Sequence, residues 1–170
     1  MAGHLDVHQL RAWDRGQPDP PVLLNEASRI DGPDRCLLCA TPEHLIVERT
    51  DDLVVAAALS AKTAHELMLW PPRHTAQIDP AHGLLESLAG QVRRALRAFR
   101  SELGTPAFNL GLYVGPAGAP GFHWHMHLLP RPDVATMGGL EMTTGMILLA
   151  VSSDGTARLL RDALAEQLVA

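Results

Sequence analysis

Several features that define other classes of protein are scarce in this chain. Lysine and arginine total 14 against 19 acidic residues, so the net charge of −5 provides no overall field that would attract nucleic acid. No run of about 18 apolar residues occurs, which argues against a membrane-spanning helix. The first thirty residues carry both acidic and basic side chains and lack the apolar core of a signal peptide. We therefore expect a cytoplasmic protein with neither a nucleic-acid nor a membrane partner.

Cysteine is also scarce, since the chain has only Cys36 and Cys39. In a cytoplasmic protein, two cysteines separated by two residues favour metal or redox chemistry over a structural disulfide. A pair of zinc ligands is the favoured interpretation, while a redox dithiol and a chance spacing remain alternatives.

The chain divides into two parts of different composition. Residues 1–35 are rich in proline, glycine and aspartate and show no hydrophobic period, which predicts an extended N-terminal arm. Residues 36–170 follow as the folded domain. A hydrophobic content of 46% with 19% charged residues fits one compact domain with a substantial core.

Hydrophobic patterning in the second part predicts an antiparallel sheet of about five strands with one central and one C-terminal helix, an α+β fold. The expected strands are at 44–48, 53–59, 66–70, 108–114 and 122–130, with a further one at 144–151. The expected helices are one that begins with Asp79 as N-cap and Pro80 as first residue and ends at Gly104, and one at 159–168. The apolar stripe predicted for the central helix is Leu85, Leu88, Val92, Leu96, Phe99 and Leu103.

The most informative segment is 122–130, which reads Phe-His-Trp-His-Met-His-Leu-Leu-Pro. Its strict alternation predicts a strand with His123, His125 and His127 on one face, about 6–7 Å apart, and apolar side chains on the other. Imidazole suits nucleophilic attack, proton transfer or metal binding near neutral pH. Three interpretations follow: His125 as a nucleophile, two of the histidines as ligands of one metal, or histidines without a special role.

A structural zinc site needs four ligands, commonly two thiolates and two imidazoles. The cysteine pair supplies two of them. His74, which follows the apolar strand at 66–70, and one histidine of the row could supply the others, with His44 as a rival. By contrast, His65 and Glu66 are interpreted as polar ends of a strand.

The histidine run resembles the signature of the histidine-triad superfamily, His-φ-His-φ-His-φ-φ with φ hydrophobic, over residues 123–129. The Pro-Arg that follows it and the Pro-x-x-His form of residues 71–74 look similar to that superfamily too. The Cys-x-x-Cys pair is similar to zinc-containing bacterial members and to the galactose-1-phosphate uridylyltransferase branch, which residues 138–145 also resemble. The resemblance covers roughly residues 36–168 and implies a histidine-triad-like fold that binds a nucleotide.

By this resemblance His125 attacks the α-phosphorus of a nucleotide-containing ester or anhydride and becomes nucleotidylated, and His127 contacts the phosphate oxygens. The resemblance also implies substrate-binding residues, namely Asn109, Gly118, Gly121 and Arg131. It implies a structural Zn²⁺ held by Cys36, Cys39, His74 and His123. The glycine-rich loop 115–121 would wrap the phosphates with its backbone N–H groups.

Two departures from the resembling proteins affect the reaction that we expect. Many members carry glutamine or serine in the loop before the triad, where residues 117–121 read Ala-Gly-Ala-Pro-Gly. The uridylyltransferases carry glutamine where His127 stands. His127 favours a hydrolase or phosphorylase, whereas Glu141 and the cysteine pair favour a transferase.

Three functional hypotheses follow. The first is an enzyme that transfers a nucleotidyl group through His125 to water, phosphate or another phosphate ester. The second is a non-catalytic, nucleotide-binding regulatory module of the same fold, and the third is a metal-dependent enzyme of another fold in which His123 and His125 bind the catalytic metal. The expected substrate is a nucleotide or nucleotide sugar.

A homodimer is also expected. The uridylyltransferases fuse two copies of this fold in a chain about twice as long, so two subunits of the present length would give an equivalent sheet. An exposed sheet edge on one subunit is a physical reason for such pairing.

Overall fold

The computed structural model describes residues 36–79, 83–104, 107–115, 121–131 and 149–167. Within them, five strands form one antiparallel sheet in the order β1-β2-β3-β5-β4. The strands are β1 (Ile46–Arg49), β2 (Val54–Ala57), β3 (Leu67–Trp70), β4 (Phe108–Tyr113) and β5 (His125–Pro130). The helices are α2 (Leu84–Leu103) and α4 (Ser153–Glu166), and the short 3₁₀ helix η3 (Glu43–Leu45) precedes β1. The predicted α+β fold is confirmed, whereas the arm over 1–35 and most of the strand expected at 144–151 lie outside the described residues.

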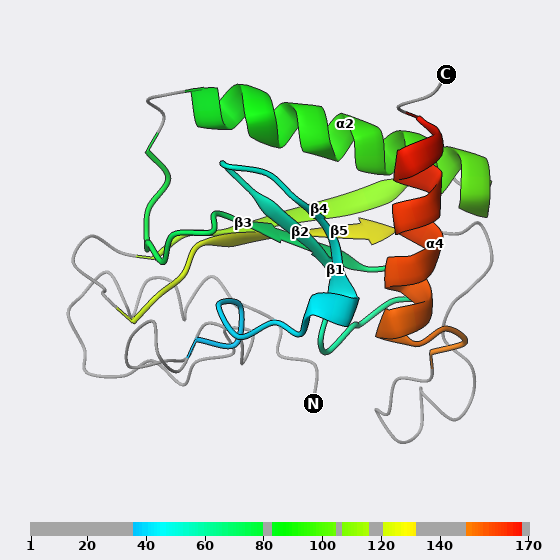
Figure 1. The fold of residues 1–170 in the computed structure, drawn as a ribbon, viewed down its shortest axis with the longest axis horizontal. Coiled ribbons are helices and arrows are strands. Elements are labelled where there is room, and N and C mark those ends of the chain that lie inside the picture. Colours follow the sequence, from blue (N-terminus) through cyan, green and yellow to red (C-terminus); the bar gives the residue numbers. More distant parts are fainter. Residues whose placement is uncertain (1–35, 80–82, 105–106, 116–120, 132–148, 168–170) are drawn as a thin grey trace.

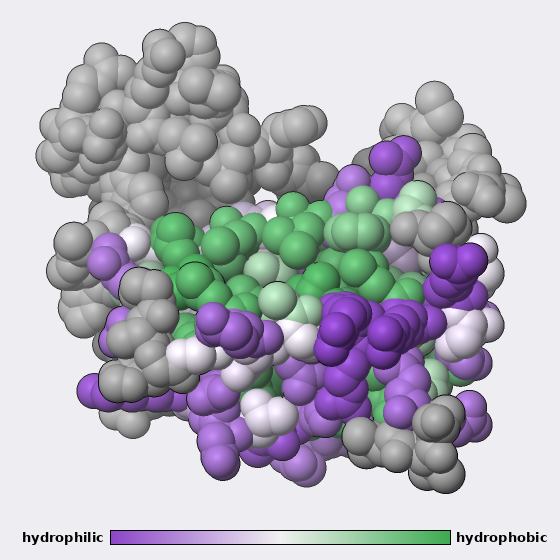
Figure 2. Space-filling model, turned by 90° about the horizontal axis from the view of Figure 1, so that it is seen from above, coloured by the Kyte–Doolittle hydropathy of each residue, from purple (hydrophilic) through white to green (hydrophobic). Residues whose placement is uncertain are grey.

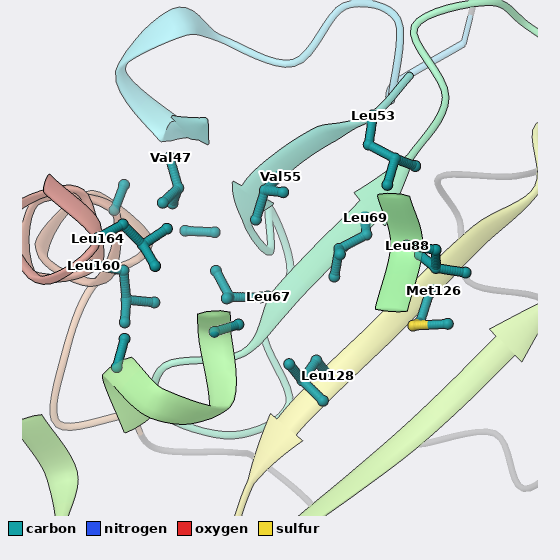
Figure 3. Close-up of a cluster of buried hydrophobic side chains, with 14 of the residues drawn as sticks. Val47, Leu53, Val55, Leu67, Leu69, Leu88, Met126, Leu128, Leu160 and Leu164 are labelled. Atoms are coloured by element: carbon teal, nitrogen blue, oxygen red, sulfur yellow. The ribbon is translucent and has the colours of Figure 1, made fainter. Parts of the chain in front are cut away.

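Both helices lie on the same face of the sheet, with α2 running along the sheet and α4 crossing near its end (Figure 1). Side chains at alternate positions of the strands point to this face, because successive residues of a strand point to opposite sides. They form the main core with the inner sides of the two helices (Figure 3). Its strand members include Val55, Leu67, Leu69, Met126 and Leu128.

The opposite face of the sheet is covered by the segment that starts at Cys36. A second apolar cluster forms there from Cys36, Leu38 and the other alternate positions of β2 and β3, among them Val54 and Met68. The side chains of His125 and His127 belong to this second face, because Met68 is the register partner of His127. The sheet therefore separates a helix-covered core from the face that carries the histidines.

The histidine strand is shorter than its sequence predicts. β5 begins at His125, and residues 122–124 lie outside the sheet ladder. The reason is that the backbone N–H of Trp124 donates to the carbonyl of Thr75, at 2.8 Å, instead of to a neighbouring strand. His123 is thereby free of the strand register.

The central helix begins later than the predicted Asp79 N-cap. α2 starts at Leu84, and its N-cap is Gly83, with a φ of 76°. The C-terminal end is as predicted, with Gly104 at a φ of 65°, where glycine has no Cβ penalty. Leu85 of the predicted stripe is 48% exposed, because the inward side of the helix includes Ala95 and Ala98 instead.

The last helix begins six residues before the predicted start at 159. The hydroxyl of Ser152 accepts the backbone N–H of Gly155 at 3.1 Å and caps α4. Hydrophobic periodicity alone misses this first turn because its residues are polar or small. The described part of the chain has no helix that is both long and apolar enough to cross a membrane.

Leu128 offers a test of how the core supports the histidine strand. The side chain is fully buried on the helix side of β5, next in sequence to His127. We expect Leu128→Ala to lower the free energy of unfolding by about 2–5 kcal/mol, because it removes buried methyl groups and leaves a cavity. Urea unfolding measures this, with half-exposed Leu85→Ala on α2 as the matched control. An equal loss in both variants would contradict the assigned core.

Candidate active site and metal centre

Four side chains from three separate segments of the chain lie close together beside the N-terminal end of β5. The ligand atoms of Cys36, Cys39, His74 and His123 all lie within 4.8 Å of one another. Nδ1 of His123 is 3.5 Å from the Sγ atoms of both cysteines, and Nδ1 of His74 is 3.6 Å from Sγ of Cys39. The structure thus brings together the four residues that the resemblance implied. His44, the rival, lies in η3 and is not part of this group.

Two backbone hydrogen bonds explain why His74 reaches His123. The carbonyl of Thr75 accepts from Trp124, and the carbonyl of Ala76 accepts from Gly115 at 2.7 Å. The segment after β3 is thus fastened to the segments on both sides of the glycine-rich loop. The two imidazole rings lie with centroids 4.7 Å apart.

The four residues fit a tetrahedral metal ion. Ligands at usual zinc distances stand about 3.3–3.8 Å from one another, and the three contacts given above fall in this range. Nε2 of His123 donates to the carbonyl of Pro71 at 2.9 Å, which leaves the lone pair on Nδ1 directed at the thiols. Burial lowers the pKa of His123 to about 4, so the ring is neutral, as metal binding requires. The group could therefore hold a metal ion.

His125 has the features of an imidazole prepared for attack. Its Nδ1–H donates to the carbonyl of His123 at 2.9 Å, which places the lone pair on Nε2. Nε2 is buried and has no hydrogen-bond partner in the described part of the protein. Burial lowers the pKa of His125 to about 4, and nearby His127 and Lys62 lower it as well. The ring is therefore neutral at pH 7, and its Nε2 has no partner among the described residues.

Two aromatic rings hold His125 in place. Tyr113 of β4 stacks on one side, with centroids 5.0 Å apart and planes 8° apart, and Phe122 stacks at 6.0 Å. Gly115 is necessary for the Phe122 position, because a Cβ there would lie 2.8 Å from the Phe122 side chain. Burial, with the charge of Glu66 as a second cause, raises the pKa of Tyr113, so its hydroxyl keeps its proton.

His127 is paired with a residue that sequence reasoning missed. Its Nδ1 lies 2.5 Å from Oε1 of Glu66, and both side chains are almost completely buried. Oε2 of Glu66 accepts the backbone N–H of Lys62 at 2.6 Å. The prediction of Glu66 as a mere polar strand end is therefore wrong. The sequence did contain a signal. Glu66 alternates with Met68 in the strand expected at 66–70, so both point to the same face, and the other residues of that strand are apolar.

For the other predicted site residues that the structure describes, it gives a backbone position. Asn109 is the register partner of Leu129, one side-chain repeat of about 6–7 Å beyond the Gly111–His127 pair. Arg131 follows the end of β5, where its backbone N–H donates to the carbonyl of Ala107. Gly121 immediately precedes Phe122 in a turn. Gly118 and Glu141 lie outside the described residues.

Comparison with known proteins places this site in context. No family model matches the chain. A curated relative, the ADP-glucose phosphorylase of Arabidopsis thaliana, is 23% identical over 159 residues, which are 84% of this chain and 44% of the relative. The chain thus spans less than half the length of that protein.

Solved structures share the fold. A uridylyltransferase matches with a TM-score of 0.66 and 22% identity over 77% of this chain and 45% of its own. A zinc-bound histidine-triad family protein from Mycobacterium smegmatis matches with a TM-score of 0.62 and 21% identity over 81% of this chain and 99% of its own. The chain has the histidine-triad fold, shared with the uridylyltransferase branch, as its sequence predicted.

Proposed function

We propose that this protein is an enzyme that transfers a nucleotidyl group from a phosphate ester or anhydride through a covalent intermediate on His125. The observation that carries the proposal is the state of that side chain. It is neutral and stacks with two aromatic rings, and its Nε2 has no hydrogen-bond partner among the described residues. An imidazole in this state can attack phosphorus and later leave from the labile phosphoramidate.

The electron pairs balance in both steps. In the first, the Nε2 lone pair forms a bond to the α-phosphorus, and the leaving group departs with the electron pair of the broken P–O bond. In the second, an acceptor oxygen bonds to phosphorus, and the N–P electron pair returns to His125. The protonated Tyr113 hydroxyl beside this ring is placed to donate to a phosphate oxygen.

A structural zinc is the metal that we propose for the four-residue group. Two thiols and two imidazoles in a closed tetrahedral set are typical of structural zinc, since a catalytic ion keeps one position for water or substrate. The bound zinc would fix the backbone at His123, whose carbonyl orients His125. Zinc in a histidine-triad neighbour supports this assignment.

A nucleotide sugar is the substrate class that we propose, because the curated relative is named for its action on ADP-glucose. The acceptor would be phosphate or water, with nucleotidylated His125 common to both. The test is to incubate the protein with nucleotide sugars and dinucleoside polyphosphates, with and without phosphate, and to follow the products by chromatography. Turnover of at least one substrate is expected. Nucleotide binding without turnover of any would favour the regulatory module.

We propose that a second copy of this chain pairs along β4. β4 is one of the two edge strands of the described sheet, and its helix-side residues Phe108, Leu110 and Leu112 are 41–45% exposed. Figure 2 looks from the α2 side and shows hydrophobic side chains gathered in a continuous area. An apolar edge strand with open backbone groups favours pairing with an identical strand across a two-fold axis.

The dimer can be tested with a matched pair of substitutions. Leu110→Lys places a charge on the β4 edge and is expected to shift the protein from dimer to monomer at micromolar concentration. Leu85→Lys changes an equally exposed leucine on α2 and should leave the dimer intact. Light scattering after size exclusion reads the mass. A monomeric wild type, or the same shift in both variants, would contradict the proposal.

A further inference from the structure

Glu66 is a buried charged group for which the proposed reaction so far has no use. Glu66 directly precedes β3, and its almost fully buried carboxylate contacts His127 on the face of the sheet that carries the histidines. A buried carboxylate is costly unless donors satisfy it. Here each oxygen has one, the ring N–H of His127 and the backbone N–H of Lys62. The carboxylate is thus held in one orientation against a single imidazole.

This contact decides which nitrogen of His127 can exchange a proton. A carboxylate that accepts this hydrogen bond requires the hydrogen to be on Nδ1 of His127, which fixes the tautomer of the ring. Nε2 is then the only ring atom through which His127 can give or take a proton. Two other titratable rings of the described residues lie beside this ring, His125 from β5 and Tyr113 from β4, with centroids 5.2 Å away in both cases. Neither of them offers a second carboxylate.

We propose that Glu66 is a positioning residue that acts through His127 and makes this imidazole the proton relay of the site. The inference rests on the proposed nucleotidyl transfer. When the leaving group departs, its oxygen takes the proton from Nε2–H of His127, and the ring becomes neutral. When the acceptor attacks, its O–H proton passes to Nε2, and the ring is again an imidazolium facing Glu66. The relay returns to its starting state after each turnover.

Carboxylate–imidazole pairs in other proteins work in the same way. A carboxylate that accepts from one ring nitrogen orients the other and stabilises the cation that forms during proton transfer. The covalent ring, His125, is instead oriented by a backbone carbonyl, which carries no net charge. The different partners separate the two roles, with an uncharged partner for the nucleophile and a carboxylate for the relay.

Glu66→Gln is the variant that tests the carboxylate. The amide keeps the size and an acceptor oxygen but removes the charge, so kcat should fall at least about 10-fold with little change in KM. Glu48→Gln is the matched control, because Glu48 is also paired, with Arg94 at 2.7 Å, but on β1, away from the histidines. Its kcat should equal that of the wild type.

A double-mutant cycle with His127→Gln shows whether Glu66 acts through that ring. In the His127→Gln background the Glu66→Gln change should have no further effect on kcat, because the relay is already lost. A wild-type kcat for Glu66→Gln alone would overturn the proposal. So would an unchanged fold-loss in the His127→Gln background.

Ring-nitrogen NMR of histidine-labelled wild type keeps the proposal testable if the variants do not fold or no substrate is found. The His127 signal, absent from the spectrum of His127→Gln or otherwise assigned through its backbone, should show a protonated Nδ1. An unprotonated Nδ1 would overturn the role of Glu66. A wild type without turnover but with a protonated Nδ1 would instead contradict the proposed function.

Discussion

Replacing His125 with alanine is expected to lower the rate of nucleotidyl transfer by about 10,000-fold or more, because no other described side chain combines the same features. Its Nε2 is neutral, buried and unpartnered, and its neighbours fix the ring plane. His127 cannot take over, since Glu66 occupies its Nδ1 and it lies a full side-chain repeat along the strand. Steady-state kinetics on the best substrate measures the loss.

His44→Ala is the control for the His125→Ala variant. His44 lies in the 3₁₀ helix before β1 and does not contact the histidines of the site, so its replacement should leave the rate unchanged. Far-UV circular dichroism and thermal melting verify that both variants fold. A His125→Ala protein that folds and retains wild-type turnover would show that the intermediate does not form on this ring.

Removal of the metal is expected to cause the largest change in stability. With the ion bound, the segments at 36–39 and 74–76 are joined to His123, which precedes β5. Without it, the buried side chains of Cys36 and His123 face the more exposed Cys39 and His74 with no common partner. We expect Cys36→Ser, or exhaustive chelation, to lower the free energy of unfolding by about 3–5 kcal/mol and the melting temperature by about 10–20 °C. Calorimetry and elemental analysis of one sample give both quantities.

The wild type should contain one zinc per chain and Cys36→Ser close to none. His44→Ala should retain its zinc, because the fold leaves His44 outside the cluster. A chelated protein that keeps its melting temperature but loses all turnover would contradict a structural zinc. That result would favour a catalytic ion instead.

The sequence predicted those parts of the site whose residues lie only two or three positions apart. Alternation in 123–127 indicated a strand and a common face, and the cysteine pair at 36–39 has a spacing typical of metal ligands. The structure brings the four proposed ligands together, which the resemblance implied. Local patterns suffice where the residues that act together lie on one turn or one strand.

The Glu66–His127 pair could not be predicted in this way. The two residues are 61 positions apart, and their contact depends on the register in which Met68 pairs with His127. Register is set by the whole sheet, and a shift of one residue would turn Glu66 to the other face. The predicted start of the central helix is wrong for a related reason. Asp79-Pro80 is a typical local signal for a helix start, but α2 begins only after its N-cap Gly83.

The central claim is that the nucleotidyl group is carried by His125. The most direct test is to quench a reaction of the wild type with a nucleotide sugar in the absence of phosphate, and to map the adduct by peptide mass spectrometry under alkaline conditions that preserve phosphoramidates. We predict a mass increase of one nucleoside monophosphate on the peptide of residues 122–130, localised to His125 and absent from His125→Ala. A substrate that turns over while the adduct maps to another residue would contradict the account.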